Sequence, residues 1–200
     1  TNFCVTMPAP GIIDRLDLFE CPRPDLGAGE VRLRMRAVGL NFRDIMAVTA
    51  LLPEEAEADH AWQNLGLEFA GDVVEVGDDL TDYVVGDRVM GMGRNCLQRF
   101  LVMDASKLIP MHDGLDYDAA ATLPSAFATA HYAINEVGRL SKGDKILIHV
   151  ATGGVGLAAV QMAQAAGAEI FATAGSDAKR AVLRELGVPH VMNSRSLDYA

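Results

Sequence analysis

The fold is decided by residues 146–160, which read ILIHVATGGVGLAAV. An apolar run of strand length is followed by a turn of small residues. Apolar side chains then recur at helical spacing, at Val155, Ala159, Met162, Ala163 and Ala166. Strand, tight glycine loop and helix in this order are typical of the first βαβ unit of a dinucleotide-binding domain. Alanine replaces the first of the three usual fingerprint glycines, so the positions are Ala151, Gly153 and Gly156.

Each small residue of this loop has a physical role. Ala151 keeps the exit from the strand tight, Gly153 lets backbone amides approach a pyrophosphate, and Gly156 lets the helix pack close to the strand. The helix is expected to begin near Val155, where its free amides and positive end favour an anion. We therefore predict a diphosphate site formed by Thr152, Gly153, Gly154, Val155 and Gly156.

Composition argues against several classes of function. The chain has 200 residues, half of them hydrophobic, and a formal net charge of −10, whereas nucleic-acid binding needs a basic face. No apolar run approaches the ~20 residues of a membrane helix, so we expect no membrane association. Three scattered cysteines without disulfide or zinc spacing favour a reducing cytoplasm. The start of the chain lacks a signal peptide, and the missing initiator Met suggests a piece of a longer protein.

Residues 1–113 are predicted to form a β-rich domain. Residues 30–39 alternate strictly, which places Val31, Leu33 and Met35 in the core and leaves the arginines of this strand on a solvated face. Residues 66–77 suggest a pair of strands separated by glycine, and the acidic residues 54–60 suggest a surface loop. Short strands with regular turn signals indicate a partly open barrel.

Residues 114–200 change to an α/β texture. Asp116 is a candidate helix cap, Pro124 starts a helix, and Ser176 caps another that ends before Gly187. With strands at 146–150, 169–174 and 190–192, the order β-α-β-α-β predicts a parallel sheet with right-handed crossovers. Such a sheet is the first half of a doubly wound domain, and we expect residues outside this chain to complete it.

The end of the second predicted strand indicates the type of nucleotide. An NAD site usually has an acid there for the ribose 2′-hydroxyl, but this strand ends Ala174-Gly175-Ser176. Lys179, Arg180 and Arg195 lie nearby in sequence, and cations and hydroxyls suit a 2′-phosphate. Asp177 is a contrary sign, although the first turn of a helix favours an acid. We predict NADPH; the alternative for Lys179 is an ordinary solvated helix lysine.

Several motifs run in order through most of the chain: GLNFRD at 39–44, GDRVMG at 86–91, AATLP at 120–124, TAHYA at 129–133, the glycine loop, and NSR at 193–195. With them the chain resembles the zinc-free branch of the medium-chain dehydrogenase/reductase superfamily. It resembles most the enoyl reductase domain of type I polyketide synthases, with animal fatty acid synthase close behind. The resemblance implies a GroES-like partly open β-barrel domain over 1–113 and the first half of a Rossmann doubly wound sheet over 114–200, with the active site in the cleft.

The zinc-dependent relatives provide a direct test for a metal. They carry Cys where this chain has Asn41-Phe42, and Gly-His-Glu where it has Gly66-Leu67-Glu68. A leucine side chain cannot bind a metal, and the histidines show no ligand spacing. We therefore expect no metal site.

The resemblance also implies cofactor contacts. Asn41 and Thr129 match residues near the nicotinamide, residues 153–156 match the diphosphate loop, and Ser176, Lys179 and Arg195 match the 2′-phosphate pocket. The alternatives are a loop-capping Asn for Asn41 and a buried helix Thr for Thr129. The family's candidate proton donors fall beyond Ala200, so no catalytic residue is assigned in this chain.

In such reductases, hydride from NADPH attacks the β-carbon of an α,β-unsaturated thioester, and the α-carbon is then protonated. The resemblance implies an acyl carrier protein, other synthase domains and a possible second copy of the chain as partners. Many polyketide reductases have a Tyr proton donor where this chain has Leu52, so we expect no protonation of that type. Two alternatives stay open: a free-standing quinone or enal reductase, and a non-catalytic nucleotide-binding or scaffolding domain.

Overall fold

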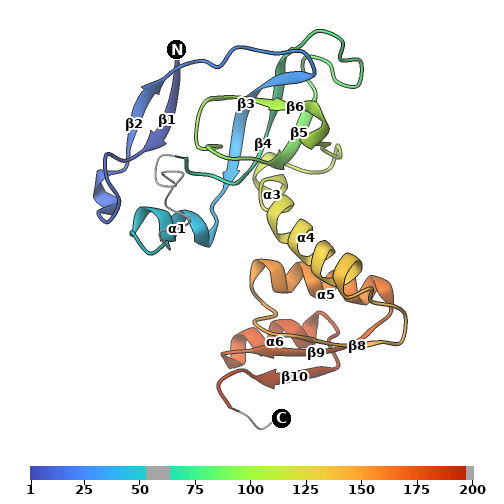
Figure 1. Cartoon of the computed structure of the whole chain (residues 1–200). Coiled ribbons are helices and arrows are strands. Elements are labelled where there is room, and N and C mark those ends of the chain that lie inside the picture. The colour runs from blue at the N-terminus through green and yellow to red at the C-terminus, as the bar shows by residue number, and fades with distance from the viewer. Residues whose placement is uncertain (53–63, 197–200) are drawn as a thin grey trace. The chain divides into compact units, whose positions relative to one another are not determined.

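The computed structural model describes residues 1–52 and 64–196, so the predicted acidic loop at 54–60 lies outside the described residues. The chain divides into two compact units, residues 1–124 (unit 1) and 125–200 (unit 2). Figure 1 shows their helices and strands and labels most of them. The predicted division into domains after residue 113 stays a prediction.

Unit 1 is built on β-strands, as the sequence predicts (Figure 1). A two-stranded ribbon pairs β1 with β2, and an antiparallel sheet has the strand order β6-β3-β4-β5-β7. The strands are β1 (Asn2–Thr6), β2 (Asp17–Cys21), β3 (Glu30–Gly39), β4 (Glu68–Val76), β5 (Arg88–Met92), β6 (Phe100–Asp104) and β7 (Leu108–Pro110). The helices are η1 (Ile13–Arg15), α1 (Phe42–Val48), η3 (Ala105–Lys107) and α3 (Tyr117–Ala120).

Strand β3 has the predicted bounds, and Val31 and Leu33 are fully buried in the core of the sheet. The expectation of a solvated arginine face is wrong for Arg32, whose side chain is 7% exposed. Its guanidinium donates to a Glu75 carboxylate oxygen at 2.7 Å and to the carbonyl oxygen of Pro24. An ion pair with an additional hydrogen bond allows the charge to be buried beside the sheet.

The strand pair predicted at 66–77 is also wrong, because β4 is one continuous strand of nine residues. Gly71 does not mark a turn. A Cβ on this residue would lie 2.6 Å from the carbonyl oxygen of Arg34 on the neighbouring strand β3. Glycine within a strand can mark a close approach of another backbone, and Gly71 has that role here.

Unit 2 has the α/β character that the sequence predicts for the second part of the chain (Figure 1). Its elements, with α4 beginning at the last residue of unit 1, are α4 (Pro124–His131), the π-helical turn η4 (Tyr132–Val137), β8 (Lys145–Ile148), α5 (Gly154–Ala166), β9 (Glu169–Ala174), α6 (Asp177–Glu185) and β10 (His190–Asn193). The parallel sheet has the order β10-β9-β8, which is the arrangement of the first half of a doubly wound sheet. No described helix has both the length and the apolar character needed to cross a membrane.

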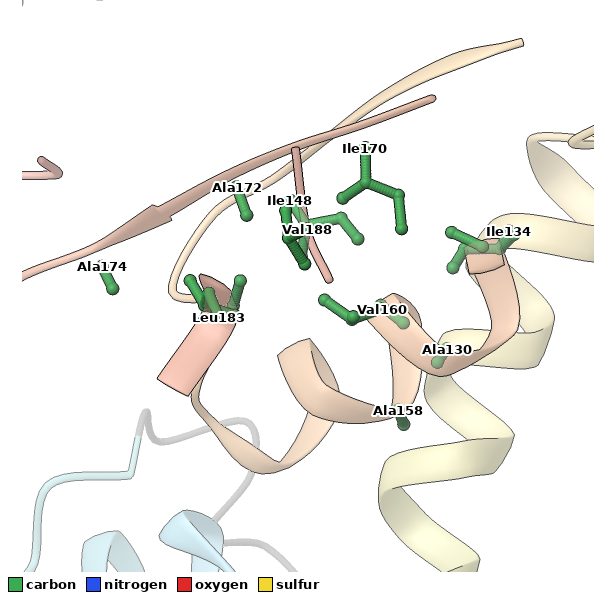
Figure 2. Close-up of a cluster of buried hydrophobic side chains, with 13 residues drawn as sticks. Ala130, Ile134, Ile148, Ala158, Val160, Ile170, Ala172, Ala174, Leu183 and Val188 are labelled. Atoms are coloured by element: carbon green, nitrogen blue, oxygen red, sulfur yellow. The ribbon is translucent and has the colours of Figure 1, made fainter. Parts of the chain in front are cut away.

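The core of unit 2 joins the sheet to its helices. In Figure 2, Ile148 and Ile170 of the sheet and Val160 of α5 belong to one buried cluster, to which Leu183 of α6 also contributes. Ile170, Val160 and Leu183 are each at most 2% exposed. This packing fixes the start of α5 beside the carboxyl end of β8, where the glycine loop lies.

Candidate functional site

The glycine loop turns sharply after β8. Val150 has φ +52°, a left-handed conformation that is unusual for a β-branched residue. Its carbonyl oxygen accepts a hydrogen bond from Gly153 N–H at 2.8 Å, which closes the turn before α5 begins at Gly154. The predicted strand therefore ends earlier than expected, and residues 149–153 form the connection.

The three glycines of the loop have different surroundings. A Cβ on Gly156 would lie 2.5 Å from the carbonyl oxygen of Val150, so the helix can approach the strand only without a side chain there. A Cβ on Gly153 would lie 3.3 Å from the same oxygen. At exposed Gly154 the nearest atom would be Ala126 Cβ at 4.0 Å, so packing leaves room for a side chain. The space above Gly154 is therefore open to a ligand.

The backbone amides at the start of α5 are arranged to bind an anion. The first helical hydrogen bond runs from Leu157 N–H to the Gly153 carbonyl at 2.8 Å, so residues 154–156 supply the first-turn amides that lack helical partners. The Gly153 amide is already used in the turn. Free amides and the positive end of a 13-residue helix favour a phosphate.

A second group of polar residues lies at the carboxyl ends of β9 and β10. Ser176 caps α6 by accepting a hydrogen bond from Lys179 N–H at 3.4 Å. A Cβ on Gly175 would lie 3.3 Å from Arg195 Nε and 3.5 Å from Ser194 Oγ. The structure thus brings Arg195 to the loop of Gly175 and Ser176, with Lys179 one turn into α6.

Asp177, the acidic residue that argues against NADPH in the sequence, has a cationic partner of its own. Asp177 forms an ion pair with Arg180, whose guanidinium also donates to the Ala174 carbonyl at 3.0 Å and to Asn193 Oδ1 at 3.3 Å. Arg180 therefore links the ends of β9 and β10. Among the described residues, Lys179 and Arg195 form no ion pair with an acidic side chain, so both cations are available to an anionic ligand.

Thr129 lies on α4 and is exposed, which disfavours the alternative of a buried helix threonine. It follows Ala126, whose Cβ faces Gly154, by about one helical turn. Thr129 therefore lies on the helix that borders the glycine loop.

Asn41 belongs to unit 1 and caps the start of α1. Its N–H donates to Asp44 Oδ2 at 2.9 Å, and its side-chain amide donates to Glu68 Oε1 at 3.0 Å. Asp44 and Glu68 are 4% and 5% exposed, and Asp44 Oδ1 also accepts from Gly66 N–H. Both roles weighed for Asn41 are compatible with this geometry, because it lies at a helix start and its side chain is held in a fixed orientation.

A buried thiol lies beside this acidic pair. Burial, together with the negative charge of Asp44 and, more weakly, of Glu68, raises the pKa of Cys96 to about 12. The thiol is therefore protonated at neutral pH and is no thiolate ligand or nucleophile. Within residues 1–52 and 64–196, no group of three His, Cys, Asp or Glu side chains is arranged to hold a metal ion.

Several features of the candidate site are not visible in the sequence. The motif identified the glycine positions, but nothing in the sequence shows that Val150 is left-handed or that Gly154 faces open space. The hydrogen bond from Asn41 to Glu68 joins residues 27 positions apart. The only sequence signal for Glu68 is the motif at residues 66–68, which corresponds to the Gly-His-Glu of zinc-dependent relatives.

Two family models match the chain. The alcohol dehydrogenase GroES-like domain matches residues 27–113, and the zinc-binding dehydrogenase model matches residues 154–200. Together they account for much of both units.

Individual relatives are more specific. The chain is 42% identical over 192 residues to the phthioceranic/hydroxyphthioceranic acid synthase of Mycobacterium tuberculosis; the match covers 96% of the chain and 9% of the synthase. The crystal structure of CurK enoyl reductase is similar with a TM-score of 0.93 and 38% identity, covering 99% of this chain and 61% of that one. The mycobacterial Rv1454c structure complexed with NADPH is similar with a TM-score of 0.80 and 27% identity, covering 96% and 59%. The chain thus spans only part of the proteins it matches.

Proposed function

From the premise that this chain belongs to the medium-chain dehydrogenase/reductase superfamily of oxidoreductases, we propose that it is part of the enoyl reductase domain of a multidomain polyketide synthase. The reaction is transfer of a hydride to the β-carbon of an α,β-unsaturated acyl thioester on an acyl carrier protein. Residues 1–113 are the GroES-like domain and residues 114–200 the first half of the NADPH-binding Rossmann domain.

The observation that carries the nucleotide assignment is the open space at Gly154. No packing contact requires glycine there, and a bound diphosphate would give this position a reason to lack a side chain. The first-turn amides of residues 154–156 would bind the diphosphate, with Thr152 and Gly153 shaping the turn before them. The solved relative that contains NADPH supports the same class of ligand.

The preference for NADPH over NADH rests on the carboxyl ends of β9 and β10. Ser176 and Lys179 at the start of α6, with Arg195 beside Gly175, supply a hydroxyl and two cations for the 2′-phosphate. Asp177 is already paired with Arg180, which reduces the repulsion between its carboxylate and a 2′-phosphate. A ribose-binding acid at the strand end would have favoured NADH instead.

Asn41 and Thr129 are proposed to orient the nicotinamide. When bound, NADPH supplies the hydride for the reaction. The hydrogen bond to Glu68 fixes the Asn41 side chain before any ligand arrives, which reduces the cost of ordering it. Thr129 is exposed on a helix that borders the loop.

No metal is proposed to take part. Leu67 occupies the position where zinc-dependent relatives carry a histidine, and the Asn41 amide is bonded to a carboxylate. Substrate polarisation would therefore depend on hydrogen bonds and on positioning.

The protonation step is proposed to use residues beyond Ala200. Leu52 lies where many polyketide reductases carry a tyrosine, and it packs against the cluster of Met7, Ala47, Val48 and Leu65. A leucine cannot supply a proton. The configuration at an α-methyl branch should then be opposite to that produced by the tyrosine-containing enzymes.

The proposed partners follow from the same assignment. They are the acyl carrier protein that holds the substrate, the other domains of the synthase and a second copy of the chain, all in the cytoplasm. The synthase relative, of which the matched segment is 9%, supports a multidomain context.

A free-standing quinone reductase is a weaker candidate. The quinone oxidoreductase of Coxiella burnetii has a TM-score of 0.88 but only 26% identity, against 38% for CurK enoyl reductase. A non-catalytic domain would bind NADPH without turnover.

One experiment separates the three functions. The whole purified protein is titrated with NADPH by fluorescence, and absorbance at 340 nm is then followed with a crotonyl thioester or a quinone. Oxidation of NADPH by the thioester supports the enoyl reductase. Oxidation by the quinone alone supports the second function, and binding without oxidation supports the third.

A further inference from the structure

The glycine loop contains a strained residue that needs support. Val150 is β-branched, 64% exposed and held at φ +52°. Such a residue persists in the left-handed region only where its surroundings determine its conformation. Its own exposed side chain buries little apolar area, so the support has to come from its neighbours in sequence.

Both neighbours of Val150 are bonded to one residue of the adjacent strand. Ala151 N–H donates to the Thr173 carbonyl oxygen at 3.0 Å, and His149 Nδ1 is hydrogen-bonded to Thr173 Oγ1 at 3.1 Å. Thr173 is fully buried in β9, between β8 and β10. A residue bonded on both sides of a strained position limits the conformations that the position can adopt.

The orientation of Val150 determines the shape of the nucleotide loop. Its carbonyl oxygen accepts from Gly153 N–H and lies against both Gly153 and Gly156. Rotation of Val150 away from φ +52° would remove this acceptor and allow the turn before α5 to change. The amides of residues 154–156 would then lose their fixed direction.

We propose that Thr173 and His149 are positioning residues that hold Val150 left-handed and so preorganise the loop for the diphosphate. This inference rests on the proposed function. The diphosphate is common to NADPH and NADH, so the effect applies equally to both. It therefore differs from the effect of Lys179, which would act only on the 2′-phosphate.

The test uses Thr173→Val, which removes the hydroxyl and keeps the shape and strand propensity of the side chain. We expect the affinities for NADPH and NADH to fall by the same factor, about tenfold, because nucleotide binding would then have to restore the strained conformation of Val150. The Gly153 amide should also exchange its hydrogen faster without nucleotide. Thr81→Val, on an exposed turn of unit 1, is the matched control and should change neither measurement.

Rescue distinguishes positioning from a general loss of structure. Glycine adopts φ +52° without strain, so Val150→Gly added to Thr173→Val should restore affinity to within about threefold of Val150→Gly alone. Unchanged affinity and amide exchange in Thr173→Val would overturn the proposal, as would failure of this rescue. If Thr173→Val does not fold, His149→Leu with the same rescue decides in its place. Absence of NADPH binding by the unaltered protein would instead overturn the proposed function, and the inference with it.

Discussion

The carbonyl oxygen of Val150 lies 2.5 Å from the point where a Cβ on Gly156 would stand. This relationship explains why the third fingerprint position needs glycine: the left-handed turn directs a carbonyl at the first turn of α5. Gly154, two residues earlier, has no such neighbour. The two glycines therefore have separable roles, one in packing and one in the space left for a ligand.

Alanine substitutions at these two glycines should have opposite effects on stability. Gly156→Ala should lower the free energy of unfolding by about 1–3 kcal/mol, because the new methyl group meets backbone that cannot easily move. Gly154→Ala should raise it by up to about 1 kcal/mol and yet weaken NADPH binding, because its methyl group occupies the open space. Denaturant unfolding and fluorescence titration measure the two quantities. Equal losses of stability in both variants would refute the distinction.

Removal of the Lys179 ammonium should change nucleotide preference. Lys179→Ala is expected to weaken NADPH binding about tenfold and to leave NADH almost unchanged, since a charge-assisted contact to the 2′-phosphate is lost. Arg184→Ala removes one cation near the other end of α6 and is the matched control. Titrations of both variants with both nucleotides measure the ratio. An equal loss for NADPH and NADH would refute the role of Lys179.

Metal removal should leave the activity unchanged. With Leu67 at the position of a zinc-binding histidine, dialysis against EDTA is expected to have no effect on the rate of NADPH oxidation. Elemental analysis before and after dialysis accompanies the assay. A fall in rate that added Zn²⁺ reverses would show that a metal takes part.

Glu169, the first residue of β9, should make the stability of the protein depend on pH in the acid range. His190 and, more weakly, Lys145 hold the pKa of Glu169 below its usual 4.5. A carboxylate with a lowered pKa contributes stability above its unfolded pKa and loses that contribution as pH falls through the folded pKa. The melting temperature should therefore fall less between about pH 5 and pH 3 in Glu169→Gln than in the unaltered protein. Identical pH profiles for the two proteins would exclude this contribution.

Much of the fold could be predicted because its signals are local. The alternation in residues 30–39 and the apolar run at 169–174 gave the bounds of β3 and β9. Gly167 and Gly187 both have positive φ, as expected of glycines that terminate helices. Gly167 ends α5, and Gly187 follows the end of α6 before β10. The sequence around Gly71 predicts a turn, because the contact that requires this glycine is with Arg34 on another strand.

The candidate site was predictable in its residue types but not in its geometry. The motif at 151–156 identified the glycines, whereas the left-handed Val150 depends on the hydrogen bonds of its neighbours His149 and Ala151 to Thr173 on the next strand. Arg180 was seen only as a nearby cation, and its pairing with Asp177 became visible once β9 and β10 were adjacent. Interactions between distant segments decide these features, and a single sequence carries no direct record of them.

The most direct test of the central claim follows the hydride itself. The whole protein is given a crotonyl thioester and NADPH that carries deuterium at both hydrogens of nicotinamide C4, and the product is analysed by mass spectrometry and NMR. We expect a butyryl thioester with one deuterium at the β-carbon, and a lower rate with deuterated NADH than with deuterated NADPH. A product without deuterium at that carbon, or no NADPH oxidation at all, would contradict it.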